Sequence, residues 1–188
     1  PMKGPFSATP DMYQLTGEGS TGVFGWPTVI NDENIEGYRS IATPGAVAGL
    51  CETHQRFGKL PLKDVLEPAI RLARFGHNPS WHSIYSIGSL ARMLVNYDEL
   101  RRVIMPDGHM PISDLVTPYI LRQPDLANVL SEIASKGSNG FYKGDVARAI
   151  TSEIQANGGV LSMEDMESYR PFIWEKGLEF SYRGYVES

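Results

Sequence analysis

Cysteine is almost absent from this 188-residue chain, which contains only Cys51. A single cysteine excludes an internal disulfide bond and any metal site built from several cysteines. Long apolar runs are missing too, because no stretch approaches the roughly 18 residues that a membrane-spanning helix needs. Lysine and arginine form no run, and acidic residues outnumber basic ones by 22 to 17. A nucleic-acid-binding surface is therefore not expected.

Apolar residues make up 41% of the sequence and the formal net charge is −5, which is typical of a folded globular chain. The length fits one domain or a piece of a larger one. Two features favour a piece. The chain begins at Pro1 rather than methionine, and it ends in an alternating run, Tyr182 to Ser188, that needs a partner strand. We therefore expect an internal fragment of one larger domain. The alternative is a complete small protein with ragged termini.

Three regions are expected along the chain. Residues 1–36 show neither helical nor strand period and are predicted to form an extended segment rich in glycine and proline. Residues 37–177 are predicted to hold a short strand, Tyr38–Ala42, followed by a helical array. Residues 178–188 are predicted to form a terminal strand, because apolar and polar side chains alternate there.

Helix starts are marked by a polar residue followed by proline at Thr43-Pro44, Asn78-Pro79 and Gln123-Pro124. Apolar residues at helical spacing follow each start, and the Asn78 pattern continues as far as Leu94. Similar spacing runs from residue 62 to Gly76, where Pro68 should kink or split the helix. It also occurs between residues 146 and 154. Ser162 and Asp165 resemble a capping box for a last short helix.

The segment Gly17-Glu18-Gly19-Ser20-Thr21-Gly22 matches the dinucleotide-binding pattern G-x-G-x-x-G. That function needs a strand before the glycines and a helix after them. Val23 to Pro27 cannot continue as a helix, so the segment is interpreted as a loop.

The histidines give no metal-binding pattern, since none pairs with another at i, i+4 around a glutamate. His54 is interpreted as a core residue; the others are His77, His82 and His109. Cys51 is expected on the buried face of the helix that begins near Thr43, where a thiol packs as a small apolar group.

Nucleophile motifs such as G-x-S-x-G and S-x-x-K are absent. An N-terminal amine at Pro1 could act as a base, but Pro1 precedes a loop and is interpreted as a consequence of cutting. Glu164, Asp165 and Glu167 fall in the first turn of a helix, where negative charge is favoured. Asp98-Glu99 beside Arg101-Arg102 is interpreted as a solvated charged face.

Several stretches occur together in one order and spacing. They are Asp11-Met12-Tyr13, Thr43 to Gly49, Phe57 to Leu62, Leu66 to Ala73, Phe141 to Gly144, Asn157-Gly158-Gly159 and Tyr182 to Tyr185. This set resembles the large chain of the γ-glutamyltransferases, also called γ-glutamyltranspeptidases or glutathione hydrolases. The resemblance covers nearly the whole sequence.

The resemblance implies an α+β fold, with this chain as the helix-rich portion of an Ntn-hydrolase αββα sandwich. Members of this family are made as precursors that cut themselves. The freed N-terminal threonine of the small chain then attacks a γ-glutamyl amide, and the acyl group passes to water or to an amino acid.

The family's substrate-binding arginine lies just before Pro1, and its threonine nucleophile lies beyond Ser188. The resemblance therefore implies no catalytic, substrate-binding, cofactor-binding or metal-binding residue in this chain, and no cofactor. The implied partners are the remainder of the precursor and a small γ-glutamyl substrate. Family members are often exported, but the compartment of this protein stays open.

Residues 14–36 depart from better-known family members by a Gly-rich insertion with Trp26-Pro27. Two alternatives to a γ-glutamyltransferase-like enzyme therefore remain. One is a related amide acylase of the same fold with a different acyl specificity, and the other is a helical scaffold module without chemistry.

Overall fold

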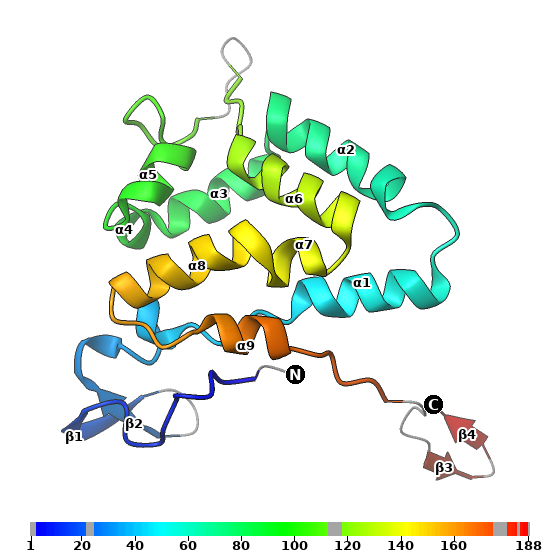
Figure 1. The fold of residues 1–188 in the computed structure, drawn as a ribbon. Coiled ribbons are helices and arrows are strands. Elements are labelled where there is room, and N and C mark those ends of the chain that lie inside the picture. The colour runs from blue at the N-terminus through cyan, green and yellow to red at the C-terminus, as the bar shows by residue number, and fades with distance from the viewer. Residues whose placement is uncertain (1–2, 22–24, 113–117, 175–179, 184, 188) are drawn as a thin grey trace. The chain divides into compact units, whose positions relative to one another are not determined.

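Figure 1 shows a computed structural model of the chain, in which helices predominate. The structure describes residues 3–21, 25–112, 118–174, 180–183 and 185–187. The chain divides into two compact units. Unit 1 comprises residues 1–56 and 142–188, and unit 2 comprises residues 57–141. Each unit has its own elements and buried side chains.

In the part of unit 2 that the structure describes, the named elements are all helices. Its elements are α2 (Leu62–Phe75), α3 (Trp81–Ser89), α4 (Ala91–Leu94), α5 (Asp98–Ile104), α6 (Pro124–Lys136) and the first residues of α7 (Asn139–Tyr142). Helices α2 and α6 lie side by side (Figure 1) and make the main helix contact of the unit. Ala73 on α2 and Ala127 and Ile133 on α6 are buried. Small alanine side chains allow two helices to approach closely.

The end of α2 is fixed by Gly76, as predicted. Its φ of 91° is a left-handed conformation that suits glycine, and its N–H donates to the Leu72 carbonyl at 2.9 Å. His77 and Leu121 then exchange two backbone hydrogen bonds of 3.2 and 3.0 Å. This bridge joins the end of α2 to the segment that leads into α6.

Pro68 does not split α2, and the predicted alternative of two helices is wrong. The helix runs from Leu62 to Phe75 with Pro68 inside it. Proline removes one backbone hydrogen bond from a helix interior. The remaining bonds and the packing of α2 against α6 outweigh that loss.

The helix predicted from Asn78-Pro79 to Leu94 starts later and is interrupted. Ser80 is the N-cap of α3, and its hydroxyl accepts from the Ser83 N–H at 3.2 Å. The chain leaves helical geometry between α3 and α4. The Ser89 hydroxyl donates to the Ser86 carbonyl at 2.8 Å at this point, a local bond that competes with helix continuation.

Unit 1 combines short strands with helices. Its elements are β1 (Leu15–Thr21), β2 (Trp26–Val29), the 3-10 turns η1 (Ile30–Asp32) and η2 (Tyr38–Ser40), α1 (Ala46–Phe57), α8 (Gly144–Ala156), α9 (Met163–Ser168), β3 (Phe180–Tyr182) and β4 (Tyr185–Glu187). Ala147, Leu161 and Met166 are fully buried, and Ala48 and Ile154 are nearly so. The core of the unit therefore lies around α1, α8 and α9. The predicted helices over α8 and α9 are confirmed.

The prediction of a segment without strands over residues 1–36 is wrong in part. Strands β1 and β2 form an antiparallel pair with Leu15 opposite Val29 and Thr21 opposite Trp26. The register shifts between Leu15 and Ser20. Gly17 and Gly19 have positive φ values within β1, so the strand lacks the regular alternation by which sequence identifies a strand.

The strand predicted over Tyr38–Ala42 is also wrong. Tyr38–Ser40 forms the 3-10 turn η2. Gly37, with φ of 83°, redirects the chain, and the Ser40 hydroxyl donates to the Gly37 carbonyl at 2.8 Å. A strand-like contact appears only later, where the Thr43 N–H donates to the Lys3 carbonyl at 3.0 Å.

The C-terminal strand is a hairpin in the part of it that the structure describes. Strands β3 and β4 pair antiparallel, with Tyr182 opposite Tyr185. Arg183 between them has a left-handed φ of 49°, which is typical of a tight turn. The prediction of a single strand is therefore wrong; its first residues, 178–179, lie outside the described residues.

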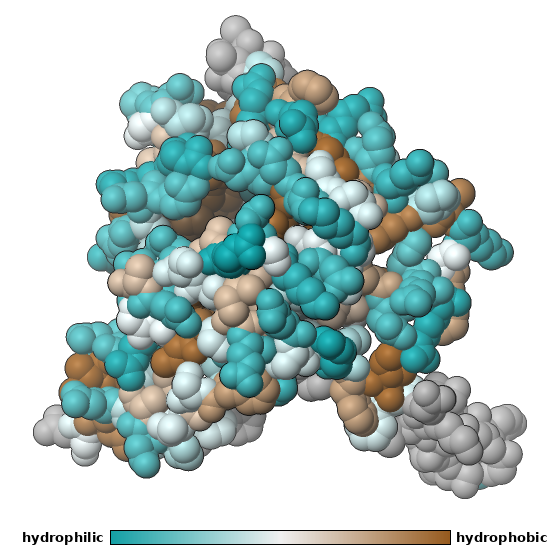
Figure 2. All heavy atoms as spheres, viewed as in Figure 1, coloured by the Kyte–Doolittle hydropathy of each residue, from teal (hydrophilic) through white to brown (hydrophobic). Residues whose placement is uncertain are grey.

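Large apolar side chains remain at the surface of both units, as the brown areas of Figure 2 illustrate. The most exposed are Phe57 at 76%, Trp81 and Trp174 at 74% each, and Leu50 and Tyr85 at 70% each. Exposed apolar area on this scale is typical of surfaces that other protein covers. Among the helices in the described ranges, none has the length and apolar character needed to cross a membrane.

Candidate functional site

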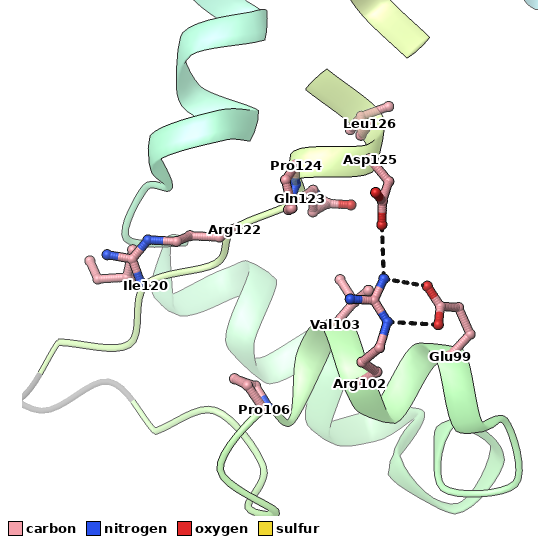
Figure 3. A pocket seen from close by; sticks show the side chains of 10 residues that line it. All are labelled: Glu99, Arg102, Val103, Pro106, Ile120, Arg122, Gln123, Pro124, Asp125 and Leu126. Carbon is pink, nitrogen blue, oxygen red and sulfur yellow. Dashed lines mark hydrogen bonds and ion pairs between the residues drawn. The ribbon is translucent and has the colours of Figure 1, made fainter. Parts of the chain in front are cut away.

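A pocket of about 340 Å³ in unit 2 lies between α5 and the start of α6 (Figure 3). Apolar side chains line it, among them Val103, Ile120 and Leu126. Its polar lining is provided by Glu99, Arg102, Arg122, Gln123 and Asp125. An apolar pocket with a few polar groups is the usual form of a ligand site. Whether these polar groups are already bonded within the protein decides whether they can bind a ligand.

Arg102 is fully engaged by two carboxylates. Its Nη2 and Nε donate to the two Glu99 oxygens at 2.6 and 2.8 Å, and Nη2 also reaches Asp125 Oδ2 at 3.0 Å. The hydrogen bond from Arg102 lowers the pKa of Glu99, and the same contacts raise the pKa of Arg102. All three side chains are largely exposed. The cluster ties α5 to α6, and both of its carboxylates are ion-paired with Arg102.

Arg122 does not join Arg102 in a common anion site. Its Nε donates to the Phe75 carbonyl at 3.2 Å, and Figure 3 shows its side chain directed away from Arg102. The two guanidinium groups therefore do not converge on one point of the pocket.

The most tightly connected polar group in unit 1 is Asp165, which is 3% exposed. Its Oδ2 accepts from the Ser162 N–H at 2.8 Å and from the Ser162 hydroxyl at 2.6 Å, which confirms the predicted capping box. Its Oδ1 accepts from the Phe6 N–H at 2.6 Å. The Ser7 hydroxyl donates nearby to the Val160 carbonyl at 3.0 Å. Asp165 therefore caps α9 and anchors the N-terminal segment at once.

The environment of Asp165 favours its charged form. Burial alone raises the pKa of this carboxyl, but the hydrogen bonds from Ser162 and Phe6 and the charge of Lys3 outweigh burial. Its pKa therefore lies below the ordinary value. A depressed pKa contributes stability that is present above the unfolded-state pKa, near 4, and is lost as the pH falls through the folded-state value.

We expect Asp165→Asn to lower the free energy of unfolding by about 1–3 kcal/mol at pH 7, because an amide presents only one acceptor oxygen to donors on both sides. Urea unfolding at pH 7 and at pH 3 measures the effect. The difference from wild type should be smaller at pH 3 than at pH 7, because the stability that comes from the lowered pKa declines once the pH falls below the unfolded-state pKa near 4. Glu164→Gln, in the same turn but exposed, is the control and should change stability by less than about 0.5 kcal/mol. An equal loss in both variants would contradict the anchoring role of Asp165.

Tyr142 caps the start of α1 from a distant part of the sequence. Its hydroxyl donates to the Pro44 carbonyl at 2.6 Å and accepts from the Ala48 N–H at 3.2 Å. The ring is stacked on Tyr169 with centroids 5.5 Å apart. A side chain at Gly45 would place its Cβ 2.3 Å from the Tyr169 hydroxyl oxygen. The two tyrosines therefore fix the turn that precedes α1, which begins three residues after the helix start that Thr43-Pro44 predicted.

Replacement of Tyr142 by phenylalanine should lower the free energy of unfolding by about 1–3 kcal/mol, because the Ala48 N–H and the Pro44 carbonyl lose a buried partner. The phenylalanine ring can keep the stack on Tyr169, so the measured loss of unfolding free energy is due to the missing hydroxyl. Chemical denaturation against wild type gives the value. Tyr85→Phe, at a residue that is 70% exposed, is the matched control and should be close to neutral. A neutral Tyr142→Phe would show that the hydroxyl does not cap α1.

The other candidate residues from the sequence do not form a common site. His54 and Cys51 are half-buried on α1 rather than fully buried, and burial raises the pKa of the Cys51 thiol. His77, His82 and His109 are exposed. In the part of the chain that the structure describes, no three His, Cys, Asp or Glu side chains are grouped to hold a metal ion.

The glycine-rich pattern lacks the context of a dinucleotide site. Residues 17–21 belong to β1, and the next regular element is β2 rather than a helix. Gly22 and Pro1 lie outside the described residues. The charged group Asp98, Glu99, Arg101 and Arg102 lies on α5, where exposure and ion pairs within the helix agree with a solvated face. The link from Arg102 to Asp125 had no signal in the sequence, because it spans 23 residues.

Comparison with known proteins places these features in a family. A family model described as "Gamma-glutamyltranspeptidase" matches residues 3–186. The acylase ACY 1 proenzyme of Pseudomonas sp. (strain V22) is 36% identical over 182 residues, which cover 96% of this chain and 31% of that protein. The glutathione hydrolase proenzyme of Escherichia coli (strain K12) is 30% identical over 184 residues, 96% of this chain and 29% of that protein.

The fold comparison gives the same result. The crystal structure of Helicobacter pylori gamma-glutamyltranspeptidase superimposes with a TM-score of 0.81 at 30% identity, over 99% of this chain and 50% of that one. The enzyme from Pseudomonas nitroreducens gives 0.75 at 28% identity, over 99% and 50%. The helix-rich α+β fold expected from the resemblance is confirmed. This chain spans about a third of the length of the curated relatives that it matches.

Proposed function

Because this chain belongs to the gamma-glutamyltranspeptidase family, we propose that it is the structural support of an enzyme that cleaves γ-glutamyl amides such as glutathione. The observation that carries the proposal is the family match over residues 3–186, since it extends over nearly every element of both units. The polar anchors at Asp165 and Tyr142 support the same role, because they hold together chain segments that are far apart in the sequence.

In the proposed reaction, the nucleophile belongs to a part of the protein outside this chain. The hydroxyl of an N-terminal threonine attacks the γ-carbonyl carbon, and its proton passes through the terminal amine to the departing amine. The C–N bond breaks and an ester joins the acyl group to the threonine. Water or the amino group of an acceptor then attacks the ester and restores the hydroxyl. Residues of this chain contribute the framework that holds these groups in place.

An amide acylase of different acyl specificity is the second candidate. The specific observation in its favour is the 36% identity to the acylase ACY 1 proenzyme of Pseudomonas sp. (strain V22), against 30% for the glutathione hydrolase proenzyme of Escherichia coli. The two candidates share the fold and the covalent route and differ in the group that they recognise on the acyl chain.

The test uses the full-length protein and two chromogenic amides, γ-glutamyl-p-nitroanilide and glutaryl-p-nitroanilide. They differ only in the α-amino group, so their relative kcat/KM reports whether that group is recognised. A preference for the γ-glutamyl compound supports the first candidate, and a preference for the glutaryl compound supports the acylase. A purified full-length protein that turns over neither compound contradicts the proposal for this family member.

A further inference from the structure

Unit 1 contains a second pocket that the proposed function does not use. Its volume is about 350 Å³, and it lies between the segment before β1, the turn η1 and Arg39 of η2. The Ile30 N–H donates to the Gln14 carbonyl at 2.9 Å, which fixes two of its walls relative to each other. The side chains of Met12 and Ile30 provide the apolar part of the lining.

Arg39 is a rigid positive group at this pocket. Its Nη2 donates to the Met12 carbonyl, and the Tyr13 hydroxyl donates to the Arg39 carbonyl at 2.9 Å. The guanidinium carbon lies 5.9 Å from the centre of the Tyr13 ring. Its Nε is 3.4 Å from Glu33 Oε2, but within the described ranges this buried nitrogen has no hydrogen bond. Because this nitrogen is buried, a molecule in the pocket meets the guanidinium as a positive charge rather than as a free Nε donor.

Three polar side chains of the lining are unengaged. The Asp11 carboxylate and the side-chain amides of Gln14 and Asn31 line the pocket. Among the described residues, none of these three groups makes a hydrogen bond or ion pair. They thus present both acceptors and donors to a molecule in the pocket.

The combination of charges selects the class of ligand. Two carboxylates, Asp11 and Glu33, repel a simple anion such as phosphate. The guanidinium of Arg39 repels a simple cation, and the part of the chain that the structure describes has no three-ligand metal cluster. A molecule with an ammonium and a carboxylate on the same carbon atom satisfies both kinds of group, because charged partners make the stronger hydrogen bonds.

We propose that this pocket binds a free α-amino acid. The ammonium group pairs with Asp11, the carboxylate lies toward Arg39 and the side-chain amides, and the amino-acid side chain packs on Met12 and Ile30. This site is separate from the catalytic reaction proposed above, since its ligand binds without any bond being formed or broken. Its test therefore needs no enzymatic activity.

The experiment measures binding of L-leucine by isothermal titration calorimetry to the longest soluble form of the protein that contains residues 1–188. Two further probes remove one charge each: N-acetyl-L-leucine lacks the ammonium and L-leucinamide lacks the carboxylate. Asp11→Asn is the test variant, because Asp11 is exposed and its replacement disturbs no contact within the described residues. Glu36→Gln, at an exposed acidic residue outside the lining, is the control.

We expect L-leucine to bind, both derivatives to bind at least about tenfold more weakly, and Asp11→Asn to weaken L-leucine binding by a similar factor. Glu36→Gln should bind as wild type does. Absence of L-leucine binding, equal binding of the three compounds, or equal binding by Asp11→Asn and wild type would each overturn the proposal. If the full-length enzyme is active but L-leucine does not bind, this site fails and the proposed function stands.

Discussion

The isolated 188-residue chain is expected to release no product from a γ-glutamyl amide. The proposed function places the threonine nucleophile in a part of the protein outside this chain. The pocket in Figure 3 is lined by carboxylates, arginines and apolar side chains, and none of its ten lining residues is a serine, threonine, cysteine or histidine. Without a nucleophile and an oxyanion-binding site, the uncatalysed rate is all that remains.

The measurement compares p-nitroaniline release by the isolated chain, by the full-length protein and by buffer. The chain should match the buffer, and a full-length protein that is active provides the positive control. A variant of the full-length protein that lacks the proposed threonine nucleophile should also match the buffer. Turnover by the isolated chain above the blank would show that it carries a catalytic group of its own, and the supporting role would have to be given up.

Gly140→Ala is expected to destabilise unit 2 by about 2–4 kcal/mol. A Cβ at Gly140 would lie 2.3 Å from the Glu132 carbonyl oxygen, 2.6 Å from its carbon and 3.0 Å from the Ile133 nitrogen. These are backbone atoms of α6, which cannot move aside as the end of a flexible side chain can. The close approach of the start of α7 to α6 therefore requires glycine.

Gly88→Ala is the matched control for this substitution. Gly88 lies on α3 of the same unit, and a Cβ there would meet no atom within 4 Å. Alanine in a helix is favoured over glycine by about 0.5–1 kcal/mol, so this variant should be slightly more stable than wild type. Urea denaturation of both variants measures the change in the free energy of unfolding, which should be negative for Gly140→Ala and positive for Gly88→Ala. If Gly140→Ala unfolds no earlier than Gly88→Ala, α7 does not pack on α6 as described.

Local signals in the sequence were sufficient for several helices. The pairing of Ser162 with Asp165 predicts a cap because both residues belong to one turn, and Gly76 marks the end of α2 for an equally local reason. The same reasoning could not identify the bond from Phe6 to Asp165, which spans 159 residues. Local reasoning also could not identify Tyr142 as the residue that caps α1, because Tyr142 lies 94 residues after Ala48.

Two predictions were wrong because single residues within or beside a short segment decide its backbone conformation against the alternation pattern. Tyr38–Ala42 alternates as a strand does, but Gly37 and Ser40 close a local turn instead. In β1, Gly17 and Gly19 obscure a real strand. The pocket near Arg39 was invisible to the sequence because its lining comes from three segments, and none of them contains a known binding motif.

The order of the two units along the sequence affects how the chain folds during synthesis. Unit 2 is one uninterrupted stretch, whereas unit 1 needs residues from both ends of the chain, including Phe6 and Asp165. On the ribosome, residues 57–141 are complete before the second part of unit 1 has been synthesised, so unit 2 can fold first. Its folding brings the flanking segments together and lowers the entropy that unit 1 must lose when its ends meet. Unit 1 is thus expected to form after unit 2.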